Sequence, residues 1–187
     1  MALRFYFIIL FLINSQHVKS QLKIYKENDI SFDSLLVLKG NQSKGKIFPM
    51  FKSANKLYAI DNSIFKNKVT YINFWFKNCP PCIAEMKALN ELYRKVQNNS
   101  KIQFISFTFE NQKTIDEMKI KYKISYPIFS ISKYDCYRLN QGNGFPTSLV
   151  VDQRGIIKFL ISGYDTNPKK AQKILLNKVY PEIYKLL

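Results

Sequence analysis

Apolar and polar residues alternate along the chain with two different periods. One run, 69–76, is nearly all apolar, as expected of a strand that a sheet buries on both faces, and 101–109 predicts a second buried strand. Between them, residues 83–96 place apolar side chains three and four positions apart, which predicts a helix with one buried face. Further short apolar runs that predict strands lie at 126–131, 148–151 and 156–162.

Local signals add the remaining elements. Thr114-Ile115-Asp116-Glu117 matches a capping box and predicts a helix from Thr114 to about Tyr122. A brief helix is expected at 133–139, and Asn167-Pro168 predicts the start of a final helix that Pro181 breaks or kinks near Tyr180. An edge strand is expected at 56–60. The order of elements predicts an α/β fold, a central mixed sheet flanked by helices.

The first 46 residues differ from the rest. Residues 1–20 carry Arg4, an apolar run from Phe5 to Ile13 and a polar stretch before Gln21, which predicts a signal peptide. The run is shorter than the ~20 residues that span a bilayer, so cleavage and export are preferred to retention as a tether. Residues 21–46 hold short alternating runs and a turn-rich break, which predicts an N-terminal β extension before a main domain at 47–187.

Two cysteines, Cys79 and Cys82, follow the first buried strand and begin the amphipathic helix. The C-x-x-C spacing lets both sulfurs meet across one helical turn, and the helix N-terminus favours a thiolate. We therefore predict a redox pair in which Cys79, exposed at the helix tip, attacks and Cys82 resolves. Pro80 and Pro81 remove two potential N–H donors to the Cys79 sulfur, which predicts a less acidic thiol and a more reducing pair.

A structural zinc site is the main alternative for such a pair. Zinc needs four ligands, but the only other cysteine is Cys136 and the only histidine, His17, lies in the predicted signal peptide. No metal site is therefore expected. Cys136 is predicted to be a small buried residue, with a resolving or regulatory role as its alternative.

The formal charge of +16 falls to +14 without Arg4 and Lys19, since 27 basic residues then face 13 acidic ones. The lysines are scattered rather than clustered, which favours a solvated surface. Aromatic residues at 104, 107 and 109 accompany no RNA-binding motif, so no nucleic-acid partner is expected. A weak association with anionic membrane surfaces or acidic substrates remains a secondary hypothesis.

Phe74-Trp75, the Cys79-Pro80-Pro81-Cys82 motif, Glu85 and the later Gly144-Phe145-Pro146-Thr147 together resemble the TlpA/ResA-like branch of the thioredoxin superfamily. The resemblance covers about residues 47–187. It implies a thioredoxin fold with extra N-terminal strands and no cofactor, because the two sulfurs carry the electrons.

The same resemblance implies roles for single residues. Pro146 would be cis, face the cysteine pair and bind substrate together with Trp75 and Phe145, while Glu85 would move protons. For Glu85 the alternative is a solvent-facing carboxylate near the helix start. The sequence departs from the family at Asn78, often Trp, and at Asn73, where thioredoxins generally carry a buried aspartate.

These observations predict an exported thiol-disulfide oxidoreductase that reduces disulfides in exported proteins and is recharged by a membrane or exported electron donor. One alternative is a Cu(I) metallochaperone, since Cu(I) prefers thiolates, and another is a peroxiredoxin-like peroxidase. Metal stoichiometry would test the first alternative and peroxide consumption the second.

Overall fold

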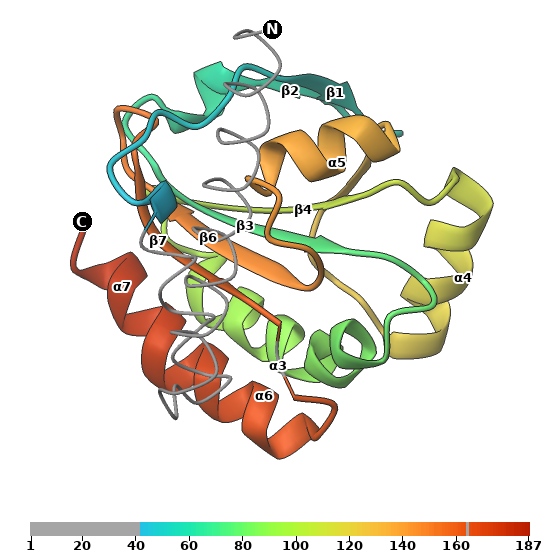
Figure 1. Cartoon of the computed structure of the whole chain (residues 1–187). Coiled ribbons are helices and arrows are strands. Elements are labelled where there is room, and N and C mark those ends of the chain that lie inside the picture. The colour runs from blue at the N-terminus through green and yellow to red at the C-terminus, as the bar shows by residue number, and fades with distance from the viewer. Residues whose placement is uncertain (1–41, 164) are drawn as a thin grey trace, which may run out of the picture. The chain divides into compact units, whose positions relative to one another are not determined.

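The central feature of the fold is a five-stranded mixed sheet of order β5-β4-β3-β6-β7 (Figure 1). The structure is a computed structural model, and it describes residues 42–163 and 165–187. The central strand β3 runs parallel to β4, and β4 runs parallel to β5. On its other side β3 pairs antiparallel with β6, which forms an antiparallel hairpin with β7. The strands are β3 (Val69–Trp75), β4 (Ile102–Thr108), β5 (Ile128–Ser130), β6 (Thr147–Val151) and β7 (Ile157–Ser162).

Strand β3 is buried along its whole length, as its apolar run predicted. Successive side chains of a strand point to opposite faces, so Tyr71 and Trp75 join one core cluster while Ile72 and Phe74 join another. The first core cluster is completed by α3 (Pro80–Val96), by Ile115 and Met118 of α4 (Gln112–Tyr122), and by the C-terminal helices. The second is completed by α5 (Lys133–Leu139) and by the chain before β3. Figure 1 accordingly shows α3, α6 and α7 on one side of the sheet and α5 on the other.

The start of α4 differs from the prediction. The helix begins at Gln112, and its cap is Asn111, whose Oδ1 accepts a hydrogen bond from the Thr114 backbone N at 2.9 Å. The predicted capping box beginning at Thr114 is therefore wrong. Asn111 is extended at φ −71° and ψ 165°, which lets its side chain reach the free N–H groups of the first turn.

The edge strand predicted at 56–60 is also displaced. β2 (Ala59–Asp61) pairs antiparallel with β1 (Lys52–Ala54) in a separate two-stranded sheet. The turn between them is fixed by Asn55, whose Oδ1 accepts from the backbone N of Leu57 and of Tyr58. This side-chain turn occupies the first half of the segment that was predicted to be extended.

The C-terminal helix begins as predicted. Asn167 Oδ1 accepts from the Lys169 backbone N at 2.9 Å, and Pro168 opens α6 (Pro168–Ile174). The expected break at Pro181 is replaced by a π-helical turn at Leu175–Val179, followed by α7 (Tyr180–Tyr184). Because Pro181 lies in the first turn of α7, where a missing N–H costs little, helical structure continues past it.

The predicted signal peptide and residues 21–41 of the predicted β extension lie outside the described residues. Within the remainder of that extension, residues 42–43 are helical and 44–46 form a turn; the next residue, Ile47, makes a single bridge to Ile156. Among the helices of residues 42–163 and 165–187, none is long and apolar enough to cross a membrane.

We predict that Phe107→Ala lowers the free energy of unfolding by about 3–5 kcal/mol. The Phe107 ring is fully buried in β4 and lies against Phe51, Phe74 and Phe129 at centroid distances of 5.4, 5.4 and 6.2 Å. Urea denaturation would measure the loss. Leu57→Ala is the control, since that side chain is 85% exposed and its removal should change stability by less than about 0.5 kcal/mol.

Candidate redox site

The two cysteines of the C-x-x-C motif form a disulfide at the N-terminus of α3, with their Cα atoms 5.2 Å apart. Cys79 is the N-cap residue of the helix, and its Sγ accepts a hydrogen bond from the Cys82 backbone N at 3.3 Å. An N-cap side chain normally accepts from the N–H two or three positions into the helix. Here the cysteine sulfur takes that place, so the helix start and the redox pair share the same atoms.

Both cysteines are buried, with exposed fractions of 3% for Cys79 and 0% for Cys82. The prediction that Cys79 is exposed at the helix tip is therefore wrong for the disulfide form. Both residues belong to the first core cluster, against which Phe76 and Phe145 pack from the surface. The pair is therefore part of the core rather than of the exposed helix tip.

Pro80 and Pro81 fill the first two positions of α3. Neither has an N–H, so the Cys82 N–H is the first in the helix that can reach the Cys79 sulfur, and it does so. An N-cap side chain can accept from the N–H groups two and three positions into the helix, and at Cys79 only the second of these donors exists. The loss of donors that the sequence predicted is therefore observed.

The peptide bond between Phe145 and Pro146 is cis, as the family resemblance implied. The loop before it is held by two hydrogen bonds to the Gly144 carbonyl oxygen, from Thr147 Oγ1 at 2.7 Å and from Asn140 Nδ2 at 2.8 Å. Pro146 is buried and Phe145 is partly exposed, with its ring against that of Phe76 at 5.3 Å. Phe76 lies three residues before Cys79, so this contact brings the loop to the start of the redox motif.

Glu85 is fully buried in α3, three residues after Cys82. Its Oε1 accepts a hydrogen bond from Asn73 Nδ2 at 2.9 Å, and Asn73 Oδ1 in turn accepts from Ser106 Oγ at 3.2 Å. Burial raises the pKa of the Glu85 carboxyl well above its usual 4.5, although the bond from Asn73 opposes the shift. The alternative of a solvent-facing carboxylate is therefore wrong, and Asn73 is a buried polar residue whose hydrogen bonds are made.

Tyr126 is a member of this site that the sequence did not single out. It is fully buried in the first core cluster, and burial followed by the nearby Glu85 charge raises the pKa of its phenol well above 10.0. Within the described residues, Glu85 Oε2 and the Tyr126 hydroxyl are buried without a hydrogen-bond partner. Ser106 was also missed. It is one of several polar residues in 101–109, and only the sheet register places it opposite Asn73.

The two remaining candidates lie on opposite sides of the sheet. Trp75 is 1% exposed and belongs to the first core cluster together with Cys79 and Cys82, so in the disulfide form its side chain is covered. Cys136 is buried in the second core cluster, on the opposite side of the sheet from Cys79 and Cys82. Burial raises the pKa of its thiol to about 12, and the prediction of a buried residue is confirmed.

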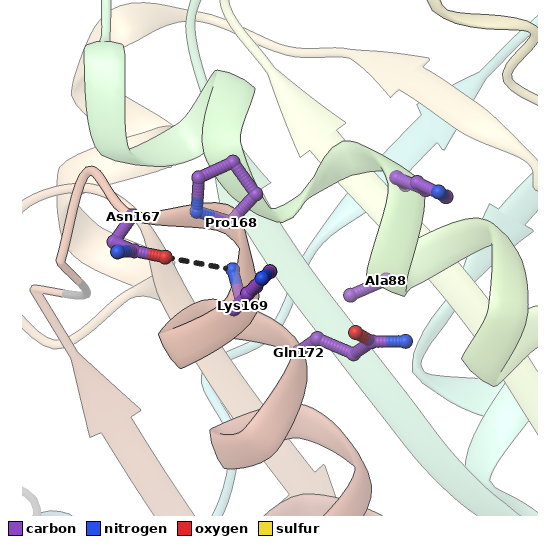
Figure 2. A pocket seen from close by; sticks show the side chains of 6 residues that line it. Ala88, Asn167, Pro168, Lys169 and Gln172 are labelled. Carbon is purple, nitrogen blue, oxygen red and sulfur yellow. Dashed lines mark hydrogen bonds between the residues drawn. The ribbon is translucent and has the colours of Figure 1, made fainter.

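A surface pocket of about 600 Å³ lies between α3 and α6 (Figure 2). Its lining residues are Lys87, Ala88, Asn167, Pro168, Lys169 and Gln172. Neither cysteine lines it, nor do Glu85 and Pro146, so the pocket is distinct from the redox site.

Residues 45–160 match the AhpC/TSA family, which is more than half of the chain. The chain belongs to the AhpC/TSA family. Two curated relatives are the thioredoxin-like protein YneN of Bacillus subtilis, 26% identical, and the thiol-disulfide oxidoreductase ResA of Geobacillus thermodenitrificans, 28% identical. The alignments cover 60% and 63% of this chain and 66% of each relative, so they span just under two thirds of the relatives' length.

Solved structures with a similar fold support the predicted thioredoxin fold. One is a thiol:disulfide interchange protein of the thioredoxin family from Chlorobium tepidum, with a TM-score of 0.57 and 20% sequence identity, covering 72% of this chain and 96% of that one. The predicted thioredoxin fold is confirmed. The family match therefore agrees with the observed fold and with the Cys79–Cys82 disulfide that the motifs predicted.

We predict that Pro81→Ala makes the reduced Cys79 thiol more acidic. The alanine supplies an N–H two positions into the helix, and a hydrogen bond to a charged sulfur should raise the thiolate fraction near neutral pH by up to about tenfold. Thiolate absorbance at 240 nm, titrated with pH, would measure the change. Ala84→Gly, in the same helix beyond the cysteines, controls for helix loosening, and an unchanged Pro81→Ala titration would contradict the role given to the prolines.

The raised pKa of Glu85 also predicts a pH-dependent stability. Above its ordinary pKa of 4.5 the unfolded chain loses the proton while the folded protein keeps it, so the buried carboxyl lowers stability increasingly as pH rises toward the folded-state pKa. Glu85→Gln should therefore gain stability relative to wild type with rising pH, by at most about 1.4 kcal/mol per pH unit. Urea denaturation of the disulfide form between pH 4 and 8 would test it. The exposed Glu117→Gln should retain the wild-type pH dependence.

Proposed function

We propose that this protein is a thiol-disulfide oxidoreductase whose Cys79–Cys82 pair cycles between dithiol and disulfide. The observation that carries the proposal is the disulfide at the N-terminus of α3, together with a cis proline whose preceding residue, Phe145, contacts Phe76 at the start of the redox motif. The relatives named YneN and ResA, at 26% and 28% identity, support it. Among the described residues, no group of three or more His, Cys, Asp or Glu side chains is placed to hold a metal ion, and the proposed cycle uses none.

The proposed reaction is a two-step exchange. The Cys79 thiolate attacks one sulfur of a substrate disulfide, which breaks that bond, forms a mixed disulfide and releases one substrate thiolate. Cys82 then loses its proton and attacks Cys79 Sγ, which releases the second substrate thiol and forms the Cys79–Cys82 disulfide. Two electrons pass to the substrate, and a dithiol donor must return them to the pair.

Glu85 is proposed to hold the proton that Cys82 must lose. The carboxyl is one turn after Cys82 on α3, fully buried, and carries a raised pKa, so it exchanges protons nearer neutral pH than an exposed glutamate would. Asn73 cannot titrate, and its bond to Oε1 fixes the carboxyl. Pro146 and Phe145 are proposed to receive the substrate chain at the edge of the pair.

The cellular setting is part of the proposal. The predicted signal peptide at 1–20 favours an exported protein, in which residues 47–187 form the working domain. Disulfide-containing exported proteins would be the substrates, and a membrane or exported donor would recharge the pair. The excess of basic residues favours a weak association with anionic membrane surfaces as well.

Reduction of insulin disulfides by the dithiol form tests the activity. Cys79→Ser should abolish turnover because it removes the attacking sulfur, and Cys82→Ser should accumulate a mixed disulfide visible by mass spectrometry. Cys136→Ser is the matched control and should keep wild-type turnover. Activity retained in Cys79→Ser would overturn the assignment of the nucleophile.

The reduction potential of the pair tests the direction of electron flow. Equilibration in dithiothreitol or glutathione buffers should give a value near that of thioredoxin, about −270 mV. A value near that of a strong oxidant, about −120 mV, would make the protein a disulfide donor instead.

A further inference from the structure

Four aromatic side chains from four separate segments meet in one cluster, and one of them, Phe76, lies three residues before Cys79. Phe76 follows β3, Phe109 follows β4, Phe145 precedes the cis proline, and Tyr137 comes from α5. We call this set, Phe76, Phe109, Tyr137 and Phe145, the aromatic rim. The two core clusters pack against it from both faces of the sheet: Phe76 lies against the first, Phe109 against the second, and Phe145 against both.

The rings of the rim are fixed by one another. Phe145 is central, with edge-on contacts to Phe76 at 5.3 Å, Tyr137 at 5.4 Å and Phe109 at 5.8 Å. Phe76 and Phe109 stack at 5.6 Å. Such arrangements hold ring orientations, so the rim is preformed rather than assembled by a ligand.

The rim is not closed as a core would be. Phe76, Phe109 and Phe145 are each partly exposed, and Tyr137 is 46% exposed. A further ring can therefore be added to the set from solvent at ordinary edge or stacking distances. Aromatic rings held in fixed positions at the surface are typical of binding surfaces.

Position determines what could occupy the rim. Cys79 is only 3% exposed and lies three residues after Phe76, so any sulfur that reaches it brings its flanking residues over Phe76 and Phe145. The occupant is therefore the segment of the substrate polypeptide next to its reactive cysteine. This step rests on the proposed function.

Charge adds a second requirement. The Lys133 ammonium lies 5.8 Å from the centre of the Phe109 ring, and within the described part of the chain no salt bridge of Lys133 is found. The other lysine near the motif, Lys77, is paired with Glu117 at 3.5 Å. A carboxylate on the substrate would therefore find its cation at Lys133.

We infer that the aromatic rim is a substrate subsite for an aromatic side chain close to the reactive cysteine, with an acidic residue beside it at Lys133. The protein would then prefer disulfides in aromatic and acidic sequence surroundings over otherwise equal ones.

The test uses symmetric disulfides of two short peptides that differ only in Phe or Ala beside the cysteine. Reduction by the dithiol protein is followed in single turnover by acid quench and chromatography, and each rate is divided by that of dithiothreitol with the same peptide. The Phe peptide should react about three- to tenfold faster. Phe109→Leu and Tyr137→Leu, which keep an apolar side chain, should each reduce this ratio at least about twofold.

Tyr134→Leu is the matched control. Tyr134 is on the same helix and 75% exposed, and no ring contact of it is found in the residues the structure describes. It should keep the wild-type ratio. A wild-type ratio of one, with both peptides reduced, would overturn the inference and leave the oxidoreductase function standing. Reduction of neither peptide, while dithiothreitol reduces both, would overturn the two together.

The acidic preference is tested with Phe-Glu and Phe-Gln peptides. The Glu peptide should react about twofold faster at low ionic strength, and the gain should vanish in Lys133→Gln and near 1 M salt, where charges are screened within about 3 Å. Lys169→Gln, in the pocket between α3 and α6, should retain the gain. If the rim instead held a second copy of the chain, sedimentation would show a dimer that Tyr137→Leu dissociates, and both peptide preferences would be absent.

Discussion

Burial of β3 on both faces is the constraint on which the rest of the structure depends. Because all seven of its residues are buried, the strand needs a neighbour on each side and a layer over each face. β4 and β6 supply the neighbours, α3 lies over one face, and α5 with the chain before β3 lies over the other. The chain leaves β3 at Trp75 and enters α3 at Pro80, so the cysteines fall where the buried strand turns into the helix.

That position explains the chemistry of the pair. A helix N-terminus favours a thiolate, but two prolines leave one N–H to reach Cys79 and the core covers both sulfurs. The balance between a favourable helix end and poor solvation should keep the disulfide from being a strong oxidant. Glu85 is fully buried, only one of its carboxyl oxygens is hydrogen-bonded within the described residues, and an unpaired buried oxygen favours the neutral, protonated acid.

The covered disulfide and the aromatic rim belong together. The Cys79 sulfur by itself does not distinguish one substrate disulfide from another, because the exchange reaction involves only sulfur atoms. In the proposed subsite, the rings held against one another around Phe145 would add a fitted contact to that approach. The loop that carries Phe145 is in turn held through the Gly144 carbonyl oxygen, which accepts hydrogen bonds from Asn140 and Thr147.

The sequence by itself determined the five strands of the main sheet, the helix after Cys79 and the cysteine pair. These follow from local periodicity and spacing, which act between residues close in the chain. It misjudged the start of α4 because Asn111 offers a stronger cap than the more conspicuous Thr114. Only the tertiary structure decided that Cys79 is covered, that Glu85 is buried against Asn73, and that Phe76, Phe109, Tyr137 and Phe145 meet. Each of these depends on residues brought together from distant segments by the sheet order, and no pattern along the chain records which strand ends become neighbours.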